Sequence, residues 1–358
     1  MPELIDGAAT GGQPGSPLPE RSELSELKKA SDEGANTKPT LSAVKLASLT
    51  FFAVCGGPFG LEPLVKNGGA RNALLGLLAI PWVYSLPMAL MTAELSTALP
   101  QSGGYIVWLH RAFGDRWAVQ ASVWTICNSF LDNAGYPIMF VDYLMEYASS
   151  PWENSSGGHI VGNATLAVAK SAADSAGEDW SMGAQWCLGM LMLVPIAGLN
   201  LRGASATADG AVGFTVLVLA PVLVMVVLGL PNVNIEALTA PPDERTKAWA
   251  GFLTLLLWNN SGYDSAGTVA SEVADPGKTY VPAMAMTMAM ASAAYCLPTM
   301  VGVCAGTKDS GTGTDVTQWF DGYWTTVAAH IGGNWLAVRT VSARNTTFGS
   351  RSAAVSLA

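Results

Sequence analysis

Long apolar runs without a charged side chain constrain this chain more than any other feature of its sequence. Four runs contain no Asp, Glu, Lys or Arg, and they cover residues 72–93, 180–201, 210–235 and 279–307. A helix needs about 20 mostly apolar residues to cross a bilayer, so each run is long enough to span. Four such runs in one chain argue against buried helices of a soluble protein and predict a multi-pass membrane protein.

Three further apolar segments are interrupted by charged residues. They are residues 41–65 with Lys45 and Glu62, residues 117–147 with Asp132, Asp142 and Glu146, and residues 248–273 with Asp264 and Glu272. Counted with the charge-free runs, they predict an all-α integral membrane fold with about seven spans.

The composition supports this class and excludes others. The chain has 358 residues, of which 50% are hydrophobic and only 13% are charged, and its net charge is −9. An average soluble domain is nearer a quarter charged, and a nucleic-acid-binding surface is basic rather than acidic. The sequence has no nucleophile–base spacing, metal-ligand cluster or phosphate loop. We therefore expect neither an enzyme nor a binder of nucleic acid, metal or cofactor.

The polar segments predict the organisation of the chain around its membrane core. Residues 1–40 are rich in charge, Pro and Gly and predict a disordered cytoplasmic tail. The long polar connection 149–179 contains two glycosylation sequons, at Asn154 and Asn163, and is expected to lie outside the cell. The transporter core is expected at 41–341, followed by a divergent polar tail at 342–358.

Two spans contain sequences that cannot continue as regular helix. In the first, Gly56-Gly57-Pro58-Phe59-Gly60 combines weak helix formers with a proline. In the sixth, residues 258–267 form a polar island, WNNSGYDSAG, within apolar sequence. Broken helices survive at membrane depth only where protein or a water-filled cavity surrounds them, and paired breaks are typical of inverted-repeat transporters. The alternatives are close helix packing at Gly56-Gly57 and a polar helix face in the sixth span.

Acids outnumber cations within the predicted spans. Glu62, Glu94, Asp132 and Asp264 lie at or near membrane depth, whereas Lys45 lies near a span end. Ionisable residues in a membrane usually face a bundle interior or cavity. The excess of acids suits an organic cation, or a proton carried on a carboxylate. Alternatively, Glu94 and Asp132 cap or pair with neighbouring helices.

Several motifs of the chain resemble those of a known family. Gly56-Gly57-Pro58-Phe59-Gly60-Leu61-Glu62 is similar to the first-span signature of the amino acid–polyamine–organocation superfamily. Later motifs are similar to the polyamine/L-type transporters of plants and kinetoplastid protozoa. These are residues 92–96 (TAELS), 103–108 (GGYIVW), 131–137 (LDNAGYP), 199–203 (LNLRG), 258–264 (WNNSGYD) and 272–276 (EVADP). The resemblance covers roughly residues 40–338.

The resemblance implies a LeuT-type inverted-repeat fold and proton-coupled uptake of polyamines such as putrescine and spermidine at the plasma membrane. The expected partners are therefore the lipid bilayer, a small organic cation and a proton. The positions that match the family's substrate site are Gly56, Gly57, Glu62, Asn259, Asn260, Tyr263 and Asp264, joined by Asp132 and Tyr136 of the third span. Asp264 and Glu62 are the candidates for proton coupling.

Two other interpretations stay open. A permease for neutral or cationic amino acids would use the backbone N–H groups near Gly56 and Gly262 to bind a substrate carboxylate. The family core has about ten spans, whereas this chain offers the first five-helix repeat and two helices of the second. We therefore expect a C-terminally truncated carrier, and the third interpretation is a non-transporting membrane fragment. The sequence carries no signal for an oligomeric state.

Overall fold

The computed structural model describes the apolar core of the chain. It covers residues 41–149, 182–201, 204–234, 248–304, 319, 323–333, 335–337 and 339–340. The predicted tail 1–40, the sequon residues Asn154 and Asn163, and residues 342–358 lie outside this part. Within it, the secondary structure is helical apart from one isolated parallel bridge between Leu41 and Val273.

Most of the helices lie in the predicted apolar segments, while two short helices, at Tyr105–Phe113 and Tyr323–Gly332, lie outside them. The first group comprises α2 (Ala43–Val54), α3 (Glu62–Ile80), the π-helical turn η1 (Pro81–Ser85), α4 (Leu86–Ala98), α5 (Tyr105–Phe113), α6 (Asp115–Ser149), α8 (Met182–Asn200) and α9 (Ala204–Gly229). The second comprises η3 (Leu230–Asn232), α11 (Trp249–Asn259), the 3₁₀ helix η5 (Tyr263–Glu272), α12 (Pro276–Cys304) and α13 (Tyr323–Gly332).

The first two predicted spans meet inside α3. Residues 41–65 and 72–93 were expected to be separate, and the stretch Glu62–Ala98, which runs through α3, η1 and α4, divides between them at a kink. Gly69 interrupts it with φ 75° and ψ 162°, which is outside the helical region. The short second half of the first span therefore meets the second span at a single glycine kink, because glycine tolerates a positive φ that other residues avoid.

Three helical stretches in the described residues are long and apolar enough to cross a membrane. They are Glu62–Ala98, Ser205–Asn232 and Pro276–Cys304. The full count of seven spans stays a prediction.

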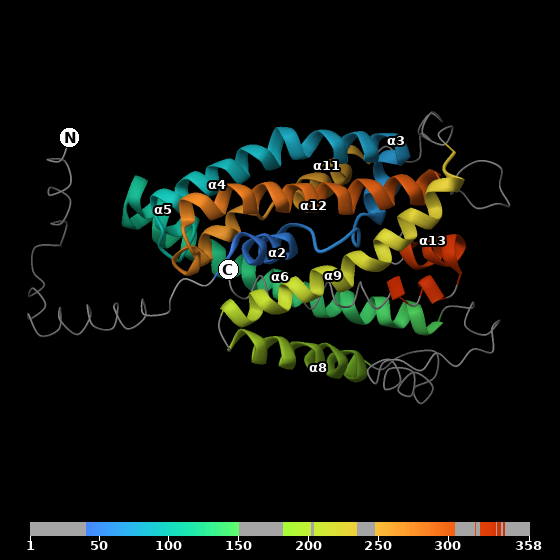
Figure 1. Ribbon diagram of the computed structural model, residues 1–358. Coiled ribbons are helices and arrows are strands. Elements are labelled where there is room, and N and C mark those ends of the chain that lie inside the picture. The colour runs from blue at the N-terminus through green and yellow to red at the C-terminus, as the bar shows by residue number, and fades with distance from the viewer. Residues whose placement is uncertain are drawn as a thin grey trace, which may run out of the picture. The chain divides into compact units, whose positions relative to one another are not determined.

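The core of this bundle is built around α2 and α12. Helix α12 packs against α2, α3, α4 and α9, while α2 also contacts α9 and η5. In Figure 1, α12 runs between the α3–α4 stretch and α2. Every residue of α2 from Leu46 to Phe52 is buried. A helix that is apolar on all sides is stable only when protein or lipid surrounds it, and here protein surrounds α2.

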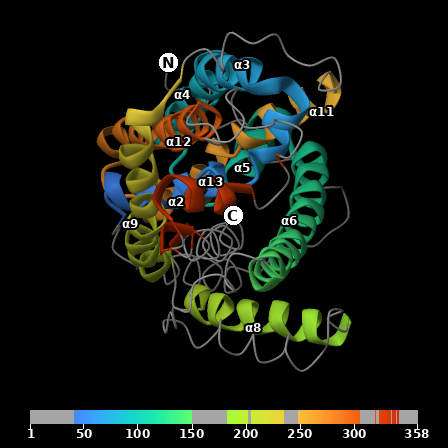
Figure 2. The ribbon, with the colours of Figure 1, turned by 90° about the vertical axis from the view of Figure 1, so that its right-hand side faces the viewer.

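Helices α6 and α8 present apolar side chains outward. α6 packs on α5 and α8, and α8 also contacts α9 (Figure 2). Trp124 and Phe130 of α6 and Trp186 of α8 are each more than half exposed. Exposed apolar side chains of this size favour contact with lipid tails over contact with water.

Candidate functional site

The first predicted helix break is confirmed. Helix α2 ends at Val54 and α3 begins at Glu62. Between them Gly56, Gly57 and Gly60 have φ values of 71°, 121° and 88°. A residue with a Cβ is disfavoured in this left-handed region, so the three glycines allow a course that a regular helix excludes.

The second predicted break is also confirmed. Helix α11 ends at Asn259, and the chain resumes as the 3₁₀ helix η5 at Tyr263. Gly262 lies in the gap with φ 101°. The polar island of the sequence is therefore the point at which the sixth span changes from α to 3₁₀ geometry.

The two breaks contact each other directly. A Cβ atom added to Gly262 would stand 2.9 Å from Ala53 O and 3.5 Å from Val54 Cα. Two features favour glycine at position 262. The backbone of α2 occupies the space that a Cβ would need, and the φ angle is positive. The breaks, more than 200 residues apart in the sequence, thus form one region of the fold.

Tyr295 of α12 reaches both breaks. Its hydroxyl donates to Asn259 O at 2.9 Å and to Val54 O at 3.3 Å. These carbonyls end α11 and α2, where the last carbonyls of a helix lack a partner within the helix. The ring is fully buried, at 1% exposure.

Two further side chains donate to carbonyls of the breaks. Ser85 Oγ, at the end of the π-helical turn η1, donates to Asn260 O at 2.9 Å. Trp324 Nε1, on α13, donates to Pro58 O at 2.8 Å. Both side chains are buried. Unpaired backbone groups are costly at membrane depth, and side chains of neighbouring helices remove that cost here.

The sequence reasoning missed Tyr295, Ser85 and Trp324. A usable signal was present for two of them: a tyrosine in a charge-free run needs a partner for its hydroxyl, and Pro81 disturbs the helix one turn before Ser85. Neither signal predicts which carbonyl accepts the hydrogen bond, because the acceptors are distant in the sequence.

The two predicted acids occupy equivalent places. Glu62 lies in the first turn of α3 and Asp264 in the first turn of η5, directly after each break. Glu62 is fully buried, and its Oε2 accepts a hydrogen bond from Gly60 N at 2.8 Å, whereas Asp264 is half-buried. Both carboxylates therefore stand close to the partial positive charge of a helix N-terminus.

The two asparagines of the second break are buried and bonded along their helix. The side-chain amides of Asn259 and Asn260 donate to Leu255 O and Leu256 O, each at 2.9 Å. Asn259 Oδ1 is buried and has no hydrogen-bond partner in the described part of the chain. It is therefore a buried acceptor open to a donor, a rare state for a polar atom. Tyr263 follows with its ring buried.

The third-span candidates lie on another element. Asp132 and Tyr136 belong to α6, and Asp132 accepts a hydrogen bond from Asn128 one turn earlier, at 2.9 Å. The side chain of Tyr136 lies outside the described part. Two other charged residues near the span ends lie away from the breaks. Glu94 is exposed on α4, and Lys45 forms an ion pair with Asp209 at 2.7 Å.

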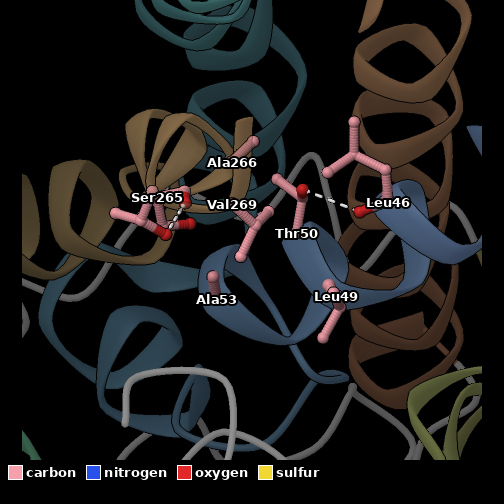
Figure 3. Close-up of a pocket in the computed structure, with 8 residues that line it drawn as sticks. Leu46, Leu49, Thr50, Ala53, Ser265, Ala266 and Val269 are labelled. Atoms are coloured by element: carbon pink, nitrogen blue, oxygen red, sulfur yellow. Dashed lines mark hydrogen bonds between the residues drawn. The ribbon is translucent and has the colours of Figure 1, made fainter. Parts of the chain in front are cut away.

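A hollow opens beside the second break, between α2 and η5 (Figure 3). It contains about 290 Å³ of space, part of it open to the surroundings. The residues of α2 that line it are Leu46, Leu49, Thr50 and Ala53, and those of η5 are Ser265, Ala266, Thr268 and Val269. Thr50 Oγ1 donates to Leu46 O and Ser265 Oγ to Gly262 O, so these hydroxyls are satisfied by their own segments. The hollow is therefore mainly apolar.

The comparison with known families identifies the chain's relatives. The amino acid permease family matches residues 41–343. The chain belongs to the amino acid permease family. This membership confirms the resemblance found in the sequence, and it agrees with the expectation of a non-enzymatic membrane protein.

Two curated relatives of this permease chain come from plants. It is 34% identical over 299 residues to the probable polyamine transporter At3g19553 of Arabidopsis thaliana, which covers 83% of this chain and 55% of that protein. It is 33% identical over 297 residues to the polyamine transporter PUT1 of Oryza sativa subsp. japonica, covering 83% of this chain and 49% of the relative. The permease chain spans about half the length of these relatives.

A solved structure confirms the fold. The crystal structure of MhsT in complex with L-phenylalanine aligns with a TM-score of 0.61, covering 89% of this chain and 72% of that one. The sequences are only 11% identical, so this likeness concerns the fold alone. The permease chain has the LeuT-type architecture that the family resemblance implied.

Proposed function

We propose that this permease chain belongs to a carrier of small organic cations, in particular of polyamines such as putrescine and spermidine. The two helix breaks bind the substrate, the carrier works by alternating access with a co-transported proton, and it resides in the plasma membrane. The plant relatives named as polyamine transporters support the substrate class. Proton coupling rests on the carboxylates at the breaks.

One observation carries the choice of a cationic substrate. Gly60 N, a backbone donor freed by the first break, already donates to Glu62 Oε2 at 2.8 Å. The other glycine donors of that break are also engaged: Gly56 N donates to Phe51 O, and Gly57 N to Cys55 Sγ. A substrate carboxylate would therefore compete with groups of the protein, one of them a carboxylate.

An ammonium group meets the opposite situation. The carboxylates of Glu62 and Asp264 attract it, and the buried Asn259 Oδ1 accepts one of its hydrogens. Hydrogen bonds with a charged partner are about twice as strong as neutral ones. A diamine or triamine can place separate ammonium groups near the two breaks.

The second candidate is a permease for neutral or cationic amino acids. The family description favours it, as does the printed complex of MhsT with L-phenylalanine. This alternative requires free N–H donors at a helix start to hold the substrate carboxylate. The engaged donors of Gly56, Gly57 and Gly60 make it the weaker candidate.

The coupled proton is assigned to Asp264 rather than Glu62. The N–H donor at Glu62 and the start of α3 both stabilise the ionised form of that carboxylate. Asp264 also begins a helix but is half-buried, so water can exchange a proton with it. Glu62 then serves mainly as the fixed charge that attracts the ammonium group.

Uptake into proteoliposomes tests this function. We expect the reconstituted chain to accumulate labelled putrescine under an inward proton gradient, with spermidine competing and leucine not competing. Glu62→Gln and Asp264→Asn should each reduce uptake at least tenfold. Asp115→Asn is the matched control, because Asp115 is an exposed acid paired with His110 away from the breaks.

The outcomes separate the candidates. Competition by arginine or leucine but not by spermidine would support the amino acid permease instead. Unchanged putrescine uptake in both acid variants would remove the carboxylates from the site. If the uptake that remains in Asp264→Asn is the same with and without a proton gradient, the assignment of the proton to Asp264 is supported.

A further inference from the structure

We propose that Tyr295 is a positioning residue that holds the two helix breaks together through one hydroxyl group. The inference deepens the proposed function, since it rests on the two breaks forming one substrate site. Neither the family match nor the motifs of the sequence single out this residue.

The geometry places the hydroxyl between the ends of two helices. Tyr295 Oη lies 2.9 Å from Asn259 O, the last residue of α11, and 3.3 Å from Val54 O, the last residue of α2. Both carbonyls point away from their helices and carry the partial negative charge of a helix C-terminus. Two such oxygens repel each other unless a donor lies between them.

A tyrosine hydroxyl supplies one hydrogen, which two acceptors can share in a three-centre hydrogen bond. The shorter distance to Asn259 O makes α11 the stronger partner. Because the ring is buried on α12, the hydroxyl is held in place by packing rather than by the breaks themselves. α12 thus sets the separation of the ends of α2 and α11.

Neighbouring side chains of α12 make simpler contacts. Thr287 Oγ1 donates to Ala47 O of α2 at 3.2 Å, and Tyr280 Oη donates to Ala266 O of η5 at 2.9 Å. Each of these reaches one broken span, whereas Tyr295 reaches both. Tyr280 is also a fully buried tyrosine of α12 whose hydroxyl donates to a backbone carbonyl, so it serves as a control that lacks the bridge.

The consequence for binding is pre-organisation. A substrate with two ammonium groups binds more tightly when both halves of its site already stand at the right distance. Loss of the bridge should therefore weaken substrate binding and leave later steps of the cycle less affected.

Cys55 provides a direct measurement that needs no transport. It follows Val54 in the first break and is fully buried. We would keep Cys55 as the single cysteine by replacing Cys127, Cys187, Cys296 and Cys304 with serine or alanine. A second background would keep Cys304, which is also buried but lies at the C-terminal end of α12.

We expect Tyr295→Phe to raise the alkylation rate of Cys55 by about three- to tenfold, the effect of losing one buried hydrogen bond. Tyr280→Phe should leave Cys55 protected, and neither variant should change the alkylation of Cys304. Incorporation of 4-aminophenylalanine at position 295 should restore protection, since its amino group can again donate to both carbonyls. In uptake, Tyr295→Phe should raise the KM for putrescine several-fold more than it lowers kcat.

Three results would overturn the inference. Cys55 could stay protected in Tyr295→Phe, or Tyr280→Phe could expose it equally, or Cys304 could become reactive in parallel, which would indicate general loosening. If the unaltered chain does not take up putrescine, the proposed function fails, but the alkylation experiment still decides the role of Tyr295.

Discussion

Gly262 lies against Ala53 so closely that a Cβ on the glycine would stand 2.9 Å from Ala53 O. The glycine belongs to the second helix break, and the alanine precedes the first. This contact brings the two breaks into one region, and it makes the second break sensitive to a single methyl group.

Gly262→Ala should destabilise the protein and abolish uptake. The added Cβ meets the α2 backbone, and the positive φ costs about 1–2 kcal/mol for a residue other than glycine. Gly114→Ala is the control, because Gly114 also has a positive φ but has nothing within 4 Å of an added Cβ. Thermal unfolding in detergent should show a lower Tm for Gly262→Ala than for Gly114→Ala. Equal Tm values for the two variants would mean that the backbone at Ala53 shifts to accommodate the added Cβ at little cost.

Glu62→Gln and Glu62→Ala should differ in stability. The glutamine amide oxygen can still accept the hydrogen bond from Gly60 N, so Gln should preserve the fold while removing the charge. Alanine leaves a buried N–H donor without its partner, which costs about 1–3 kcal/mol. We expect a clearly lower Tm for Glu62→Ala alone. A loss of the same size in Glu62→Gln would indicate that the charge, rather than the hydrogen bond, supports the break.

The ion pair between Lys45 and Asp209 should contribute little to stability. It joins α2 to α9 at 2.7 Å, but the Asp209 side chain is 61% exposed. Exposed pairs typically contribute about 0–1 kcal/mol. A double-mutant cycle with Lys45→Met and Asp209→Asn should give a coupling energy within this range that falls as salt is added. A coupling above about 2 kcal/mol would show a desolvated pair.

Trp324→Phe should weaken the first break. The indole N–H donates to Pro58 O at 2.8 Å, and phenylalanine keeps one aromatic ring but lacks the donor and the second ring of the indole. Pro58 O also accepts a long hydrogen bond from Leu61 N at 3.4 Å, so we expect the lost hydrogen bond to cost only about 0.5–1.5 kcal/mol, and the space left by the second ring to add to that loss. Trp335→Phe, at a half-exposed position, is the comparison. Equal Tm values for the two variants would dismiss the contact with Pro58.

The amino-acid sequence by itself determined the fold class and the location of the breaks. Apolar runs specify spanning helices because a bilayer admits few other structures. The positions of Gly56, Gly57, Gly60 and Gly262 specify the breaks because their positive φ values are a local property of glycine. The acids that follow each break, Glu62 and Asp264, were found for the same reason: they stand beside these glycines in the chain.

Only the tertiary structure decided how the breaks are held. Tyr295 donates to carbonyls 36 and 241 positions away, Ser85 to one 175 positions away and Trp324 to one 266 positions away. A local pattern predicts that a buried hydroxyl or indole needs an acceptor, but not which one. That choice depends on how α12, η1 and α13 pack against α2 and α11, and packing is a property of the whole bundle.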